Sequence, residues 1–124
     1  MNALLDTHAL LWWVTDDRRL SSRARALIGQ GEILVSVVSL WEIEIKRGLN
    51  RIDVNTHAIL GEVSRTDGFH WLPVMPSHVA RLIDLPPLHG DPFDRMLVSQ
   101  AGQEHVPLIT RDKALRRYPV DVVW

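Results

Sequence analysis

The sequence predicts an α/β fold in which a mostly parallel sheet is flanked by helices. Short apolar or β-branched runs recur along the chain, and each could form a buried strand. Segments with helical spacing and capping residues separate these runs. Strands that alternate with helices in this way build parallel sheets. The length of 124 residues and the hydrophobic content of 46% suit one compact domain over residues 1–124.

The first elements follow from an apolar opening and a serine cap. The run at residues 3–5 reads as a short buried strand, and a helix over residues 8–14 follows it. Ser21 and Ser22 can cap a second helix over residues 23–28, which Gly29 and Gly31 would end. The chain therefore opens with one strand and two helices.

The next strand and helix are predicted over residues 33–49. The β-branched run at residues 33–38 is typical of a strand. Ser39 followed three residues later by Glu42 forms a capping box, which places Glu42 in the first turn of a helix. The apolar stripe of that helix would be Trp41, Ile45 and Leu49.

The remaining elements alternate in the same way. We expect helices at residues 56–64, 77–83 and 112–117, and strands at residues 71–74, 106–109 and 120–124. Asp91 followed by Pro92 marks the start of a further helix, with Asp94 in its first turn. No linker or repeat divides these elements, so we predict no domain boundary.

Composition and charge exclude several classes of protein. The net charge of −1 gives no basic field that would attract nucleic acid as a whole, and the absence of cysteine excludes disulfides and thiolate metal sites. No segment reaches the roughly 20 apolar residues of a membrane span, and the start lacks a signal peptide. We therefore expect a cytoplasmic protein with no membrane partner.

Four acidic residues each have an ordinary structural explanation. Asp6 and Asp112 follow predicted strands and could simply cap helices. Glu42 could serve the capping box or pair with Lys46 four residues on. Asp94 at a helix start interacts favourably with the helix dipole.

What these explanations do not predict is that all four acids would meet at one edge of a parallel sheet. The crevice at the carboxyl ends of parallel strands is where such folds bind ligands. Carboxylates gathered there repel one another unless a cation or protons intervene. The obvious counter-charge is a hard divalent cation that takes oxygen ligands. The pattern thus indicates a metal site, composed of Asp6, Glu42, Asp94 and Asp112, that acts on a phosphate-containing substrate.

Three further residues could support such a site indirectly. Asp91 is foremost a helix cap, with a water-mediated metal contact as the alternative. Thr110, two residues before Asp112, and Thr7, next to Asp6, could orient a ligand carboxylate or water, or be ordinary strand-end threonines. His89 could touch substrate or be a structural loop residue, and the six histidines show no metal-binding spacing.

The chain resembles the PIN-domain ribonucleases, in particular the VapC-like toxins of bacterial type II toxin–antitoxin systems. Four blocks in order carry the resemblance: residues 4–13, residues 36–43 with Lys46, residues 85–97 and residues 108–112. The resemblance implies a Rossmann-like sheet, Mg²⁺ or Mn²⁺ held by acidic residues, and endonucleolytic cleavage of RNA. The acidic positions of the family fall on Asp6, Glu42, Asp94 and Asp112. It also implies a homodimer and a cognate antitoxin, which can form a larger toxin–antitoxin assembly.

Basic residues next to the acidic positions are the candidates for holding RNA. Arg95 and Arg111 each neighbour a proposed ligand, and Lys46 lies one turn from Glu42. An ordinary solvated face is the alternative explanation for these side chains.

Two other functions remain open. A phosphatase of another Rossmann-like family is disfavoured, because the haloacid dehalogenase type needs an acid where this chain has His8. A binding module without catalysis would need the acids only as helix caps. Metal-dependent cleavage of RNA that disappears when Asp6 is replaced would distinguish the nuclease from both.

Overall fold

The computed structural model describes residues 2–124 as a five-stranded sheet with helices on both faces. All strand pairs are parallel, in the order β3-β2-β1-β4-β5. The strands are β1 (Ala3–Leu5), β2 (Ile33–Ser36), β3 (Phe69–Leu72), β4 (Leu108–Ile109) and β5 (Val122–Val123). The predicted α/β fold is confirmed, and the sheet is entirely parallel.

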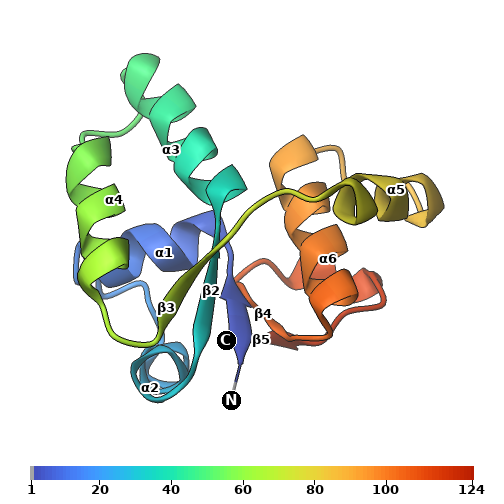
Figure 1. The fold of residues 1–124 in the computed structure, drawn as a ribbon, viewed down its shortest axis with the longest axis horizontal. Coiled ribbons are helices and arrows are strands. Elements are labelled where there is room, and N and C mark those ends of the chain that lie inside the picture. Colours follow the sequence, from blue (N-terminus) through green and yellow to red (C-terminus); the bar gives the residue numbers. More distant parts are fainter. Residues whose placement is uncertain (1) are drawn as a thin grey trace.

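Helices cover the two faces of the sheet in separate groups (Figure 1). They are α1 (Thr7–Val14), α2 (Ser22–Gln30), α3 (Val37–Gly48), α4 (Thr56–Arg65), α5 (Pro76–Asp84) and α6 (Pro92–Glu104), with the 3-10 turn η1 (Lys113–Arg117) before β5. Helices α1, α2 and α4 lie on one side of the sheet, and α5 and α6 lie on the other. No helix within residues 2–124 has the length and apolar character needed to span a membrane.

Two apolar cores result from the alternation of side chains along each strand. Leu5 and Ile33 point into the core beneath α1, α2 and α4, whereas Leu4 and Leu108 point into the core beneath α6. All four are fully buried, because each face of a parallel sheet is covered by helices.

The boundary between β2 and α3 differs from the prediction. The strand ends at Ser36 and the helix begins at Val37, three residues earlier than a cap at Ser39 requires. The Ser36 hydroxyl accepts a hydrogen bond from the Val38 amide at 3.0 Å and donates one to Gln100 at 2.6 Å. Ser36 is therefore the cap, and the predicted capping box of Ser39 and Glu42 is wrong. The β-branched residues enter the helix because the Gln100 contact holds Ser36 in place.

The predicted apolar stripe of α3 is also wrong. Trp41 and Leu49 are 61% and 58% exposed. The buried face of the helix consists instead of Val38, Ser39, Glu42 and Ile43. The face of α3 that packs against the sheet carries Glu42, so a prediction that places only apolar residues on the buried face was wrong.

The other elements agree with the prediction to within a few residues. β3 begins at Phe69, two residues before the predicted start, and β4 and β5 are shorter than predicted. Asp91 caps α6 through the amides of Phe93 and Asp94, as predicted.

Candidate active site

The four acidic residues converge on one small pocket at the carboxyl edge of the sheet. Asp6 follows β1, Asp112 follows β4, Asp94 lies in the first turn of α6, and Glu42 lies in the second turn of α3. Together they line a cavity of about 90 Å³, which Lys46, Asp91, Thr7 and His8 complete. Volume alone does not identify the site: a hollow of about 640 Å³ beside α3 is larger, but it is lined mainly by apolar side chains.

Asp6 is a deeply buried carboxylate at the end of the central strand. Its side chain is 5% exposed and accepts a hydrogen bond from the Ala9 amide at 2.7 Å, so it also caps α1. Burial raises the pKa of Asp6 from 3.8 to about 6, although hydrogen bonds from Thr110 and Ala9 lower it. The charges of Glu42 and Asp112 raise it further. The ionised form of Asp6 is therefore poorly compensated by the protein itself.

Glu42 is held by two neighbours. It is 4% exposed, accepts a hydrogen bond from the Thr7 hydroxyl at 2.6 Å, and pairs with the Lys46 ammonium at 2.7 Å. The i, i+4 pairing with Lys46 was one of the two structural explanations offered by the sequence, and it is present. Thr7 thus orients an acid from a different element, which its place beside Asp6 did not reveal.

Asp94, in the first turn of α6, lines the pocket together with Asp6 and Glu42. Burial raises the pKa of Asp94 to about 6, and the charges of Asp91, Asp6 and Glu42 raise it as well, whereas a hydrogen bond with His89 lowers it. Asp91 uses one oxygen to accept the amides of Phe93 and Asp94 at 2.8 and 3.0 Å. This cap fixes the first turn of α6 and directs Asp94 into the pocket.

Asp112 is the most open of the four. Its side chain is 42% exposed, and it caps η1 by accepting the Ala114 amide at 2.9 Å. The Thr110 hydroxyl accepts a hydrogen bond from the Asp112 amide at 3.0 Å, and its interaction with the Asp6 carboxylate lowers the pKa of that acid. Thr110 therefore connects two of the acids, an arrangement that suits the supporting role expected for it.

The basic candidates lie in different surroundings. Lys46 is in the pocket and paired with Glu42. The Arg111 guanidinium lies 5.7 Å from the centre of the Trp12 ring, and Arg111 is not among the residues that line the pocket. Arg95 points elsewhere, because its guanidinium donates to the Pro86 carbonyl and to the Tyr118 hydroxyl. A role in holding the loop before α6 accounts for Arg95 without RNA.

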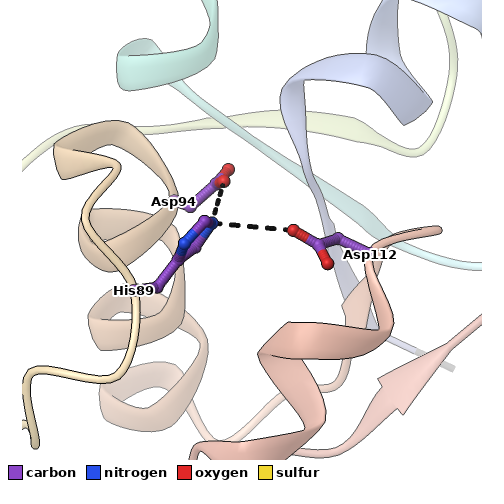
Figure 2. Close-up of side chains that lie close together, drawn as sticks. All are labelled: His89, Asp94 and Asp112. Atoms are coloured by element: carbon purple, nitrogen blue, oxygen red, sulfur yellow. Dashed lines mark hydrogen bonds and ion pairs between the residues drawn. The ribbon is translucent and has the colours of Figure 1, made fainter.

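His89 is the residue whose place at the site sequence reasoning did not establish. Its Nε2 atom lies 2.9 Å from Asp94 Oδ2 and 3.6 Å from Asp112 Oδ2 (Figure 2). The only local signal was its position in the loop just before the Asp91 cap. Its proximity to Asp112, 23 residues away, arises from the packing of α6 against β4.

The chemistry of these donors fits a divalent cation. Five carboxylates line the pocket, and Lys46 is the ammonium that faces them. Burial opposes ionisation of Asp6 and Asp94, so a bound cation would stabilise the charged forms that the protein alone disfavours. Oxygen donors gathered around a small cavity are what Mg²⁺ and Mn²⁺ require.

Comparison with known proteins agrees with this arrangement. Residues 3–121 match the family described as the PIN domain. The chain is 33% identical to Ribonuclease VapC22 of Mycobacterium tuberculosis (strain ATCC 25618 / H37Rv) over 131 aligned positions, covering 98% of this chain and 97% of that protein.

Two solved structures share the fold at low identity. The VapBC2 complex of Rickettsia felis, bound to a DNA fragment from its promoter, aligns with a TM-score of 0.73 and 14% identity, covering 99% of this chain and 98% of that one. A toxin-antitoxin complex from Klebsiella pneumoniae aligns with a TM-score of 0.69 and 20% identity, covering 98% and 96%. The family match spans nearly the whole chain and includes the four acids predicted for the site, and the chain therefore belongs to the PIN domain family.

Proposed function

We propose that this protein is a metal-dependent endoribonuclease that acts as the toxin of a toxin–antitoxin pair. The observation that carries the proposal is the pocket of buried carboxylates at the carboxyl edge of a PIN-domain sheet. The full-length similarity to a protein named as a ribonuclease supports RNA as the substrate. The whole chain, residues 1–124, would act as one domain in the cytoplasm.

Asp6 and Asp94 would be the principal ligands of Mg²⁺ or Mn²⁺, because burial makes their ionised forms the ones that most need a cation. Glu42 and Asp112 would complete the site directly or through water. When bound, such a cation supplies Lewis-acid activation of water and neutralises negative charge on the phosphodiester.

The surrounding residues keep these carboxylates in position. Thr7 and Lys46 hold the two oxygens of Glu42, so the side chain cannot turn away from the pocket. Thr110 supports Asp6, and the Asp91 cap orients the first turn that carries Asp94. Such fixed donors lower the reorganisation that catalysis would otherwise need.

RNA would approach from the open side, where Asp112 is exposed. Arg111 directly precedes Asp112 in the chain, and it is the basic residue that we propose contacts the RNA backbone. Lys46 could contribute once a cation relieves its pairing with Glu42. Arg95 is the weakest of the three candidates because its donors already hold the loop.

The proposed activity is tested by incubating a mixed RNA pool with the purified chain in Mg²⁺, in Mn²⁺ and in EDTA. Cleavage should require metal and should fall at least about 10³-fold in Asp6→Asn and Asp94→Asn. Asp84→Asn, which removes an exposed carboxylate at the end of α5, is the matched control and should cut normally. Full activity of Asp6→Asn would refute the assignment. Hydrolysis of phosphomonoesters without RNA cleavage would favour a phosphatase, and metal-independent RNA binding alone would favour a binding module.

A partner protein is the second part of the proposal. Structures of similar fold are toxin–antitoxin complexes, which supports a cognate antitoxin for this chain. Co-expression of the chain with the product of an adjacent gene should suppress RNA cleavage and yield a stable complex. Unrestrained cleavage by the co-purified pair would contradict this part.

A homodimer is the third part, and we assign it to the apolar face beside α3 and α5. Trp41, Val79 and Ile83 are 61%, 49% and 84% exposed, and a groove of about 640 Å³ runs between α3, α5 and α6. Large exposed apolar side chains beside an apolar groove are typical of a protein–protein interface, which buries roughly 800 Å² per partner.

Light scattering of the purified chain tests the dimer. We expect twice the chain mass, and we expect monomers for Ile83→Glu because it would bury a charge in the interface. A wild-type monomer that binds antitoxin would instead assign this face to the antitoxin.

A further inference from the structure

His89 approaches the candidate site from a loop that none of the four acids belongs to. The loop connects α5 to α6, and the imidazole points from it toward Asp94 on α6 and Asp112 after β4 (Figure 2). The three side chains are 28%, 23% and 42% exposed, so they form a partly open wall of the site rather than part of the core. His89 therefore lies where an ion or a substrate could reach it.

The three donor atoms are spaced as ligands of one cation are. One nitrogen or oxygen atom from each residue lies within 4.8 Å of the other two. Ligands bound about 2.1 Å from an ion sit roughly 3 Å apart when they are neighbours. The 2.9 Å between His89 Nε2 and Asp94 Oδ2 matches that spacing, and the 3.6 Å to Asp112 Oδ2 is slightly longer.

A hydrogen bond alone explains only half of this arrangement. A neutral imidazole carries one N–H group, and at Nε2 it satisfies Asp94. The Asp112 oxygen, at 3.6 Å, is too far for a hydrogen bond, yet it faces the same nitrogen. A cation bound here would take the Nε2 lone pair, with the ring proton on Nδ1, and could bind this nitrogen and both carboxylates together.

We propose that His89 supplies a nitrogen ligand, with Asp94 and Asp112, to the divalent cation of this site. This inference rests on the metal dependence proposed above and adds to it a choice of ion. Mg²⁺ prefers oxygen ligands and loses its water reluctantly, whereas imidazole suits transition metals. The site therefore selects Mn²⁺ or Co²⁺ over Mg²⁺.

Electron spin-echo spectroscopy of bound Mn²⁺ tests the ligand directly, without any measurement of activity. Coupling of the ion to ¹⁴N should appear in the wild-type chain and change to the ¹⁵N pattern when the protein is labelled with ¹⁵N-histidine. His89→Gln should abolish the coupling while Mn²⁺ still binds through the carboxylates. His8→Gln is the matched control, because His8 lines the same pocket but is not part of the three-residue group.

Calorimetric titration with Mn²⁺, Co²⁺ and Mg²⁺ measures the preference of the site among these ions. His89→Gln should weaken Mn²⁺ and Co²⁺ binding by about 10- to 100-fold and Mg²⁺ binding by less than about threefold. The ¹⁵N-labelled wild type keeps the test decisive even if the variant folds poorly.

The outcomes separate the two proposals. Mn²⁺ that binds and is lost in Asp94→Asn, but shows no nitrogen coupling, would overturn the role of His89 and leave the metal-dependent nuclease intact. Coupling that survives His89→Gln and disappears in His8→Gln would also overturn it. Failure of the wild type to bind any divalent cation would overturn both proposals.

Discussion

Replacing Asp6 by Asn should stabilise the metal-free protein at neutral pH, although it should abolish the proposed activity. Asp6 is almost completely buried, and burial raises its pKa from 3.8 to about 6. At pH 7 the folded protein carries this carboxylate in its unfavourable ionised form. At about 1.36 kcal/mol per pKa unit, the rise corresponds to about 3 kcal/mol of lost stability.

The substitution keeps most of the other interactions of Asp6. An Asn side chain can accept the Ala9 amide as Asp6 does, and Asn is as good a helix cap as Asp. We therefore expect Asp6→Asn to raise the free energy of unfolding by about 3 kcal/mol at pH 7 in EDTA.

The sign and the pH window follow from proton linkage. An acid whose pKa is raised by folding binds more protons in the folded state than in the unfolded state, so stability falls as the pH rises between the two values. Wild type and Asp6→Asn should thus be about equally stable below pH 3.8. Between pH 3.8 and about 6, the variant should become progressively more stable than wild type. Above pH 6 the difference should stay constant.

Urea unfolding followed by tryptophan fluorescence, at pH values from 3.5 to 8 in EDTA, measures this difference. Asp112→Asn is the control, because Asp112 caps η1 in the same way but is 42% exposed, and it should change stability by less than about 1 kcal/mol. Mn²⁺ at 1,000 times the dissociation constant should reverse the order, since wild type then gains about 4.1 kcal/mol. A variant no more stable than wild type at pH 7, or a gap equally large at pH 3.5, would refute the reasoning.

Three further substitutions test the packing and the charges around the site. Gln100→Leu should lower the free energy of unfolding by about 2 kcal/mol in urea titrations, because the buried Ser36 hydroxyl loses the acceptor that lies 2.6 Å away. An unchanged stability would mean that this hydrogen bond does not hold the start of α3. Ile109→Ala, in the fully buried β4 strand, should cost about 2–5 kcal/mol and lower the melting temperature measured by calorimetry, and a loss under about 1 kcal/mol would imply that the core collapses around the gap. Lys46→Met should destabilise the metal-free protein by about 1–2 kcal/mol, because it leaves the buried Glu42 carboxylate without the Lys46 ammonium. In thermal unfolding, added Mn²⁺ should restore part of that loss. A loss of stability that grows with Mn²⁺ would contradict a role of Glu42 in binding the metal.

Sequence reasoning identified the acids of the pocket because their positions depend on local rules. Asp6 stands directly after β1 and Asp112 three residues after the end of β4, and both cap the elements that follow. Asp91 and Pro92 determine where α6 begins, so the place of Asp94 in its first turn was predictable. Parallel strands then bring such positions to one edge of the sheet.

The predictions that were wrong concern features that depend on contacts between residues far apart in the sequence. Ser36 caps α3 partly because Gln100, 64 residues away, holds its hydroxyl. Trp41 lies on an exposed face because packing buries the opposite side of α3. Neither contact leaves a trace in the local pattern of α3.

The sequence by itself determined the parallel α/β fold, the family and the four acids, because strand patterns, caps and motifs act over a few residues. Only the tertiary structure decided the depth of Asp6, the pairing of Glu42 with Thr7, and the approach of His89 to two carboxylates. These depend on how the helices pack on the two faces of the sheet, and packing sets the burial and the distances on which charge, pKa and metal binding depend.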